Sequence, residues 1–165
     1  QTAGKGDKMA GFMVGYKAGP LNVALGYQDE KTKSKYTGVA ASYDFGVASI
    51  SGGFNTRKGS TTALGKDDEF TAGINVPVGA AVNVSLGYAS SKTKVNAATT
   101  GKSDGFGLGA TYALSKRTNV YGVLTRFDNS DTAQAAPGGN GYLGGVTATA
   151  GTDSTSIALG MRHSF

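Results

Sequence analysis

Few side chains of this sequence could carry out chemistry, and those few are poorly placed for catalysis. The 165 residues contain no cysteine and a single histidine, so disulfides, thiol catalysis and cysteine metal sites are excluded. The histidine, His163, lies on the outward face of the last alternating segment, where it cannot anchor a catalytic triad. A role as an aromatic ring at the lipid–water interface is a sufficient explanation for His163. We expect no catalytic residue, no cofactor and no enzymatic activity.

Adjacent acidic residues are the one candidate for binding a metal ion. Asp67, Asp68 and Glu69 are consecutive, and Asp128 and Asp131 form a second acidic pair. Carboxylate oxygens are the ligands that Ca²⁺ prefers, so the three consecutive acids are calcium candidates. The alternative is that they form the solvated end of a strand.

The elements that must position these side chains are strands. Apolar and polar residues alternate with a period of two along almost the whole chain, which predicts about nine antiparallel strands of roughly 9–12 residues. Helical spacing is nowhere sustained, and only 39% of the residues are hydrophobic. Lipid-facing and lumen-facing residues alternate in a barrel wall. The predicted fold class is therefore all-β, an antiparallel transmembrane β-barrel.

The connections between these strands alternate in length. Short turns are expected near residues 18–20, 45–47, 77–81 and 115–118, and long polar loops near 29–35, 56–67, 90–103 and 129–153. Outer-membrane barrels have short periplasmic turns and longer external loops. If Phe165 ends at the periplasmic side, every short turn falls on that side. The start of the sequence has no apolar segment of a signal peptide, so we expect that one was removed or that the protein begins further upstream.

Aromatic residues support a membrane location because they fall into two rows, as in the interfacial girdles of barrels. The final alternating segment, which ends on Phe165, would be a liability in a soluble protein and is an anchor at a lipid boundary. The row expected at the long-loop ends comprises Tyr27, Phe54, Phe70, Tyr88, Phe106 and Phe127, and the row at the short-turn ends comprises Tyr43, Phe45, Tyr112 and Phe165.

The segment 118–128 leaves two orientations open because both of its faces carry apolar residues. In one, Tyr121, Val123 and Phe127 face lipid and Arg126 faces the lumen. In the other, Val120 and Leu124 face lipid, and Arg126 points toward the headgroups. An arginine costs less in the lumen than in lipid, but the sequence leaves both orientations open.

Inward positions define a candidate pore lining. The net charge is +5, yet acids accompany the basic residues at the long-loop ends, and no basic recognition element for nucleic acid is present. Positive side chains in a water-filled pore favour anions; Lys17, Arg57 and Arg162 are expected there, partly opposed by Asp44. The small polar residues expected to line the pore are Asn22, Ser51, Asn83, Ser85 and Thr111.

Four stretches of the sequence resemble Gram-negative general porins of the beta-proteobacterial type, several of which favour anions. They are SIALGMRHSF, TYALSKRTNVYG, YKAGPLNVALGY and ASYDFGVASISG. The resemblance covers essentially the whole chain and implies the C-terminal half, strands eight to sixteen, of a trimeric 16-stranded barrel. It also implies that the last strand is the signal read by the barrel-assembly machinery, with Phe165, His163, Met161, Leu159 and Ile157 as its residues.

The same resemblance implies that seven strands and the inward-folded third loop, which narrows the pore, are absent. Nine strands cannot close as an antiparallel barrel, and single-chain bacterial barrels have even strand numbers. Unpaired edges in lipid cost several kcal/mol for each backbone group. Either another chain supplies the remaining strands, or 8–17 is not a full strand and eight strands close alone.

We therefore expect residues 1–165 to be the C-terminal portion of one barrel domain in an outer-membrane porin. Its expected function is passive diffusion of small hydrophilic solutes, with a preference for anions. The expected partners are the missing N-terminal strands, two further copies in a homotrimer, membrane lipid, lipopolysaccharide and small anionic solutes. The alternative is a small eight-stranded outer-membrane barrel with a structural or adhesive role, which would need inward charge networks. The side chains at the inward positions are too small to fill the interior of such a narrow barrel.

Overall fold

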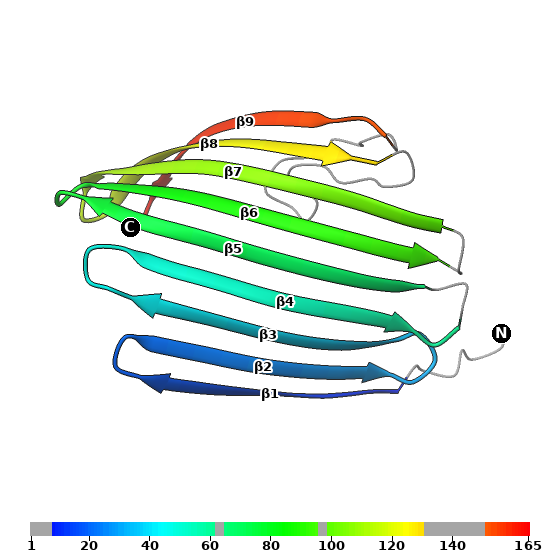
Figure 1. Cartoon of the computed structure of the whole chain (residues 1–165). Coiled ribbons are helices and arrows are strands. Elements are labelled where there is room, and N and C mark those ends of the chain that lie inside the picture. Colours follow the sequence, from blue (N-terminus) through cyan, green and yellow to red (C-terminus); the bar gives the residue numbers. More distant parts are fainter. Residues whose placement is uncertain (1–7, 62–64, 96–98, 131–150) are drawn as a thin grey trace, which may run out of the picture.

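The computed structural model describes residues 8–61, 65–95, 99–130 and 151–165, and these residues form nine antiparallel strands (Figure 1). Within these ranges the structure holds no helix long and apolar enough to span a membrane. The strands are β1 (Met9–Ala18), β2 (Leu21–Glu30), β3 (Ser34–Asp44), β4 (Ser49–Gly59), β5 (Lys66–Val78), β6 (Val82–Val95), β7 (Thr99–Ser115), β8 (Thr118–Asn129) and β9 (Ser154–His163).

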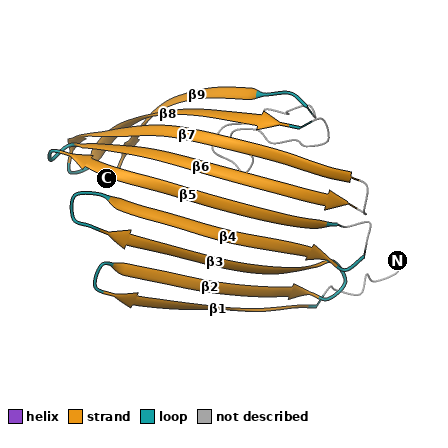
Figure 2. Ribbon diagram, viewed as in Figure 1, coloured by secondary structure: helices purple, strands orange, loops and turns teal. Residues whose placement is uncertain are grey.

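Each strand pairs with its neighbours in sequence, so the sheet has the order β1 to β9 with β1 and β9 as its edges (Figure 2). This confirms the predicted all-β antiparallel architecture. β1 is a full strand that pairs with β2 in register from Met9 opposite Glu30 to Ala18 opposite Leu21. The alternative that the sequence left open, in which 8–17 is not a full strand and eight strands close alone, is therefore wrong.

The register separates two faces with different chemistry, because residues directly opposite each other in an antiparallel pair lie on the same face. On one face, Leu25 lies between Val14 and Val39. On the other, Gly87 lies between Gly73 and Gly107. We call the apolar face the outer face and the small, polar face the inner face.

Apolar side chains of the outer face are not covered by any part of the described protein. None of the described hydrophobic residues is buried, and Leu159 and Ile157 are 83% and 73% exposed. A water-soluble sheet would bury such a face against a second layer. The environment that covers this face is therefore the hydrocarbon of a membrane.

Short turns lie together at one end of the sheet, as the sequence predicts. They connect β1 to β2, β3 to β4, β5 to β6 and β7 to β8 (Figure 1). In the first three turns a glycine has a positive φ, 53° at Gly19, 82° at Gly46 and 67° at Gly79, a conformation that costs other residues energy. A β-bulge between Ala113 and Ser115 precedes the fourth turn.

The opposite end differs from the prediction because two of the expected long loops are largely strand. β2 and β3 are joined by residues 31–33 alone, and the β6–β7 ladder continues to Val95 opposite Thr99. The polar composition of 90–103 suggested a loop, but the period-two register continues through it, so β7 reaches 17 residues. The strands thus project beyond the roughly 10 residues that cross the bilayer. Most of the last long loop, 131–150, lies outside the described residues.

β8 has the second of the two orientations that the sequence left open. Leu124 lies opposite Leu108 and Ile157, and Arg126 lies opposite Phe106, so all of these are on the outer face. Phe127 lies opposite Gly105 on the inner face, and its assignment to the outer aromatic row is wrong. The ring fits there because Gly105 leaves space for it.

Candidate functional site

The inner face is a wall of small and polar side chains. A hollow of about 500 Å³ lies over its centre, where Ser85 donates a hydrogen bond to Asn75 (2.8 Å) and Asn75 donates one to Asn83 (3.4 Å). These paired amides and hydroxyls present a surface that water wets. By register, all of the residues predicted to line a pore occupy this face: Lys17, Asn22, Asp44, Ser51, Arg57, Asn83, Ser85, Thr111 and Arg162.

Charges on the inner face separate by position along the strands. At the short-turn end lie two cations and one anion: Lys17, Arg162 and Asp44. At the long-loop end lie one cation and three anions: Arg57, Glu30, Asp67 and Glu69. The inner positions of the described strands therefore carry three positive and four negative charges. Positive charge dominates at the short-turn end alone.

Arg57, one of the predicted pore-lining cations, is engaged by a neighbouring carboxylate. Its Nε donates to Asp67 Oδ2 at 2.5 Å, and its Nη1 donates to Ser34 Oγ at 3.4 Å. Both side chains of the ion pair are only partly exposed, 28% for Arg57 and 19% for Asp67. The positive charge that Arg57 presents to the inner space is thus largely compensated, which the sequence did not reveal.

The three consecutive acids predicted as calcium candidates do not converge on one point. Strand alternation places Asp67 and Glu69 on the inner face and Asp68 on the outer face, where Asp68 binds Lys66 at 2.8 Å. Among the residues that the structure describes, no group of three or more acidic, histidine or cysteine side chains could hold a metal ion.

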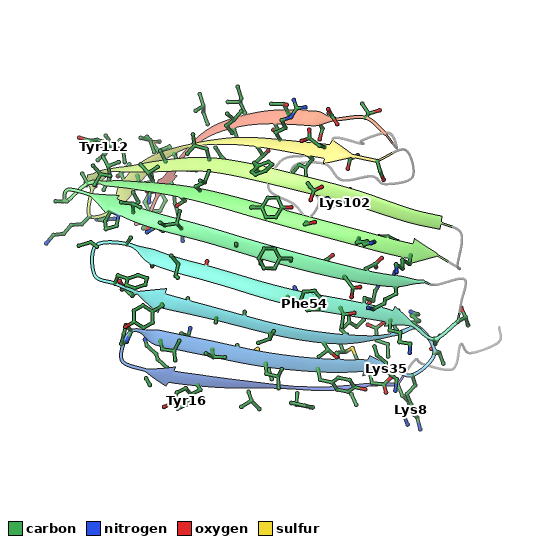
Figure 3. All side chains as sticks on the ribbon, viewed as in Figure 1. Lys8, Tyr16, Lys35, Phe54, Lys102 and Tyr112 are labelled. Carbon is green, nitrogen blue, oxygen red and sulfur yellow. The ribbon has the colours of Figure 1, made fainter. Side chains whose placement is uncertain are left out.

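A row of aromatic rings crosses the outer face near the long-loop ends of the strands. Tyr88 lies between Phe70 and Phe106, with ring centroids 6.3 Å and 5.0 Å away. The Tyr88 hydroxyl donates to Asp104 at 2.7 Å, so the ring lies against lipid and its polar atom points to the charged end, as at a membrane interface. Phe54 projects from the same face (Figure 3). The second row, at the short-turn end, includes Tyr43 and Phe45 in contact (4.6 Å).

Beyond the aromatic row, the outer face carries a band of lysines that sequence analysis did not assign to a face. Lys35 binds Asp29 at 3.1 Å, and Lys102 binds Asp104 at 2.7 Å. Both lysines lie at the long-loop end of the sheet in Figure 3. Hydrogen bonds from Lys102, the larger cause, and from Tyr88 hold the pKa of Asp104 below its ordinary value. Extending the period of two from Tyr88 through Ser90 to Lys92 would have revealed this band.

The C-terminal residues predicted as an assembly signal lie on one face of β9 and just after it. Ile157 and Met161 are opposite Leu124 and Val120 on the outer face. His163 shares a 2.8 Å hydrogen bond with Thr118, and its ring stacks edge-on against Phe165 at 4.9 Å. His163 is thus part of an exposed aromatic cluster at the short-turn end.

A sheet with an uncovered apolar outer face, two aromatic rows and a polar inner face is the wall of a transmembrane β-barrel. The chain belongs to the Gram-negative porin family, whose family model matches residues 1–132. It is an outer-membrane protein.

Individual relatives agree with this assignment. Outer membrane porin protein 32 of Delftia acidovorans is 35% identical over 179 residues, which cover all of this chain and 49% of the relative. The solved anion-selective porin from Comamonas acidovorans is 32% identical with a TM-score of 0.79, covering 95% of this chain and 49% of that one. The trimer form of OmpT of Vibrio cholerae, 18% identical, shares the fold with a TM-score of 0.76 over 95% of this chain and 56% of that one. The chain thus spans about half the length of these relatives.

Proposed function

We propose that residues 1–165 are the C-terminal portion of one porin barrel domain, which forms a water-filled channel for passive diffusion of small hydrophilic solutes. The observation that carries this proposal is the difference between the two faces of one sheet. The outer face exposes Leu159 and Ile157 to the membrane, while small and polar residues such as Gly87, Ser85 and Thr111 leave the inner face open and wettable. No covalent step and no cofactor are involved.

We further propose that the channel prefers anions. A porin described as anion-selective is 32% identical to this chain. Lys17 of β1 and Arg162 of β9 each place a positive charge on the inner face at the short-turn end, one at each edge of the sheet. Because screening limits the reach of each charge to about 8–10 Å, each of these cations acts on the ions that pass beside it, and the acids at the other end of the strands do not cancel its effect.

The proposed channel needs partners. The edges β1 and β9 require the remaining strands of the barrel, supplied by the rest of the porin or by a separate chain, because unpaired backbone groups in lipid are costly. By analogy with the trimer form of OmpT, three such barrels associate. Lipid and lipopolysaccharide surround the outer face, and small anions pass along the inner face.

Planar-bilayer recordings of the full-length porin that contains this chain test the proposal. Discrete conductance steps and a reversal potential that shows higher permeability to chloride than to potassium are expected. A barrel that inserts but passes no current would overturn the channel and favour a structural role. Steps with a higher permeability to potassium would retain the channel and overturn the anion preference.

A further inference from the structure

Five lysines lie close together on the outer face, in a place that the channel does not use. Lys66 of β5 is directly opposite Lys58 of β4 on one side and Lys94 of β6 on the other, and Lys92 of β6 is directly opposite Lys102 of β7. We call Lys58, Lys66, Lys92, Lys94 and Lys102 the lysine row.

This arrangement is unfavourable for the sheet alone. Like charges directly opposite each other on neighbouring strands destabilise the pairing, and the lysine row contains three such pairs. The outer positions of β4 to β7 carry two carboxylates, and each forms an ion pair with one lysine of the row: Asp68 with Lys66 (2.8 Å) and Asp104 with Lys102 (2.7 Å). Five positive and two negative charges leave a local excess of three. An external anion would remove the repulsion.

The height of the lysine row is that of membrane headgroups. On each of the strands β4 to β7, a lysine of the row lies four residues along the strand from a ring of the outer aromatic row. The pairs are Lys58 and Phe54, Lys66 and Phe70, Lys92 and Tyr88, and Lys102 and Phe106. Four residues span about 13 Å of strand, less along the membrane normal because barrel strands are tilted. The aromatic rings mark the edge of the hydrocarbon layer. The ammonium groups therefore lie where the charged parts of lipids lie.

The width of the lysine row distinguishes among anionic lipids. From β4 to β7 it crosses three strand intervals, about 14 Å at ~4.8 Å each. A phospholipid with one phosphate would engage a single pair of lysines. The headgroup of lipopolysaccharide carries two phosphates, at opposite ends of a disaccharide. One phosphate can bind Lys58 and Lys66 while the other binds Lys92 and Lys102. A second copy of this face is disfavoured because it would bring positive charges together.

We propose that the lysine row is a binding site for the phosphorylated headgroup of lipopolysaccharide on the outside of the barrel. The proposal rests on the proposed function for its orientation, since it requires the long-loop end to lie at the outer leaflet. Ammonium groups bind the phosphates directly, so no divalent cation is needed to bridge carboxylate and phosphate.

Binding of purified lipid A to the full-length porin, refolded in detergent without lipopolysaccharide, tests this site. Native mass spectrometry counts bound lipid molecules for the wild type and for Lys66→Gln, Lys92→Gln, Lys94→Gln combined. The matched control is Lys8→Gln, Lys31→Gln, Lys33→Gln combined, which removes the same charge from the same end of the sheet and leaves in place both the lysine row and Lys35, the residue directly opposite Lys58. Migration of unheated samples on gels verifies that each variant is folded.

The row variant is expected to bind lipid A at least about tenfold more weakly than the wild type, since each basic residue near an anionic surface contributes measurably. The control should stay within about twofold, dephosphorylated lipid A should not distinguish the proteins, and EDTA should leave binding unchanged. Equal loss in both variants, loss caused by EDTA, or equal binding of phosphatidylglycerol would overturn the proposed site.

Conductance of the same row variant separates this proposal from the proposed function. The lysines face away from the lumen, so the conductance and the reversal potential should match those of the wild type. A loss of lipid A binding with unchanged conductance supports both proposals. A wild-type porin that binds lipid A through the lysine row but conducts no ions would leave the site standing and overturn the channel.

Discussion

The register of β8 with β7 places Phe127 on the inner face, and its ring fits there because residue 105 is a glycine. A Cβ atom added at Gly105 would lie 2.5 Å from the Phe127 ring, so the ring rests against backbone that no side chain covers. Tyr121 lies over Gly160 in the same way. Two bulky side chains of β8 thus lie against glycine backbone on the inner face.

Gly105→Ala is expected to force the Phe127 ring off the wall and to destabilise the porin by about 1–3 kcal/mol, the usual cost of overpacking. Gly107→Ala is the matched control, because the atom nearest to its added Cβ, a Thr125 methyl group, is at 3.6 Å, an ordinary contact. Urea unfolding of the full-length porin in detergent measures both. Equal stability of the two variants would contradict the packing of Phe127 on Gly105.

The ion pair between Arg57 and Asp67 makes a separate prediction about selectivity. Asp67→Asn removes a carboxylate from the inner face while Arg57 keeps its charge, so the chloride-to-potassium permeability ratio should rise by up to about twofold. Such a change matches the energy of one unit charge at ~8 Å in water. Arg57→Ser should lower the ratio.

Reversal potentials in a salt gradient measure these changes. Lys58→Ser is the control, because Lys58 is the neighbour of Arg57 in sequence but lies on the outer face. A change in the ratio for Lys58→Ser as large as for Arg57→Ser would show that total charge, rather than its face, determines selectivity.

At the scale of the element, β8 is the strand in which alternation alone does not identify the lipid-facing side. The structure places Leu124 outward, between Leu108 and Ile157, and Val123 inward, between Gly109 and Ala158. Leu124→Arg should therefore cost about 2–4 kcal/mol in folding into lipid, as a basic residue facing the bilayer centre does. Val123→Arg should fold almost as well as the wild type.

Folding yield of the full-length porin into lipid vesicles, read from the unheated gel band, distinguishes the two β8 variants. Loss of folding by Val123→Arg with normal folding of Leu124→Arg would indicate the opposite orientation of β8. Arg126 lies outward at the level of the aromatic row, directly opposite Phe106. It binds Asp128 and Asp153 (2.8 and 2.9 Å), which fits the orientation described.

Alternation predicts the elements that have one apolar and one polar face. For β2, Leu21, Val23, Leu25 and Tyr27 share a face in the sequence and in the structure, and the short turns follow from Gly19, Gly46 and Gly79. The pattern fails where both faces are polar, as in β6 beyond Tyr88, because polarity then resembles a loop. It also fails where both are apolar, as in β8, because register with β7 and β9 decides the orientation.

Side-chain pairing is the part of the candidate site that the sequence could not provide. Arg57 and Asp67 are ten residues apart and meet only because β4 and β5 pair in one particular register. Likewise, Lys58, Lys66 and Lys94 are distant in sequence and become a row only across three strands. A shift of one residue would move these side chains to the opposite face.

At the scale of the whole molecule, the sheet depends on what closes it. β1 and β9 present ten-residue edges, and none of the described apolar side chains forms a protein core. Stability in the membrane must therefore come from lipid on the outer face and from complete backbone pairing around the barrel.

The last prediction concerns this closure. Residues 1–165 refolded alone into vesicles should give no permeability to small sugars and no band that resists unfolding in detergent, because both edges leave backbone groups unpaired in lipid. Refolding them together with the remaining strands of the same porin, made as a separate polypeptide, should restore both properties, since strand pairing does not require a continuous chain. Liposome swelling with sugars of increasing size measures permeability in each case. Uniform channels from residues 1–165 alone would show that β1 and β9 meet each other or the same edges of a second copy, and the barrel would then be built differently from that of its relatives.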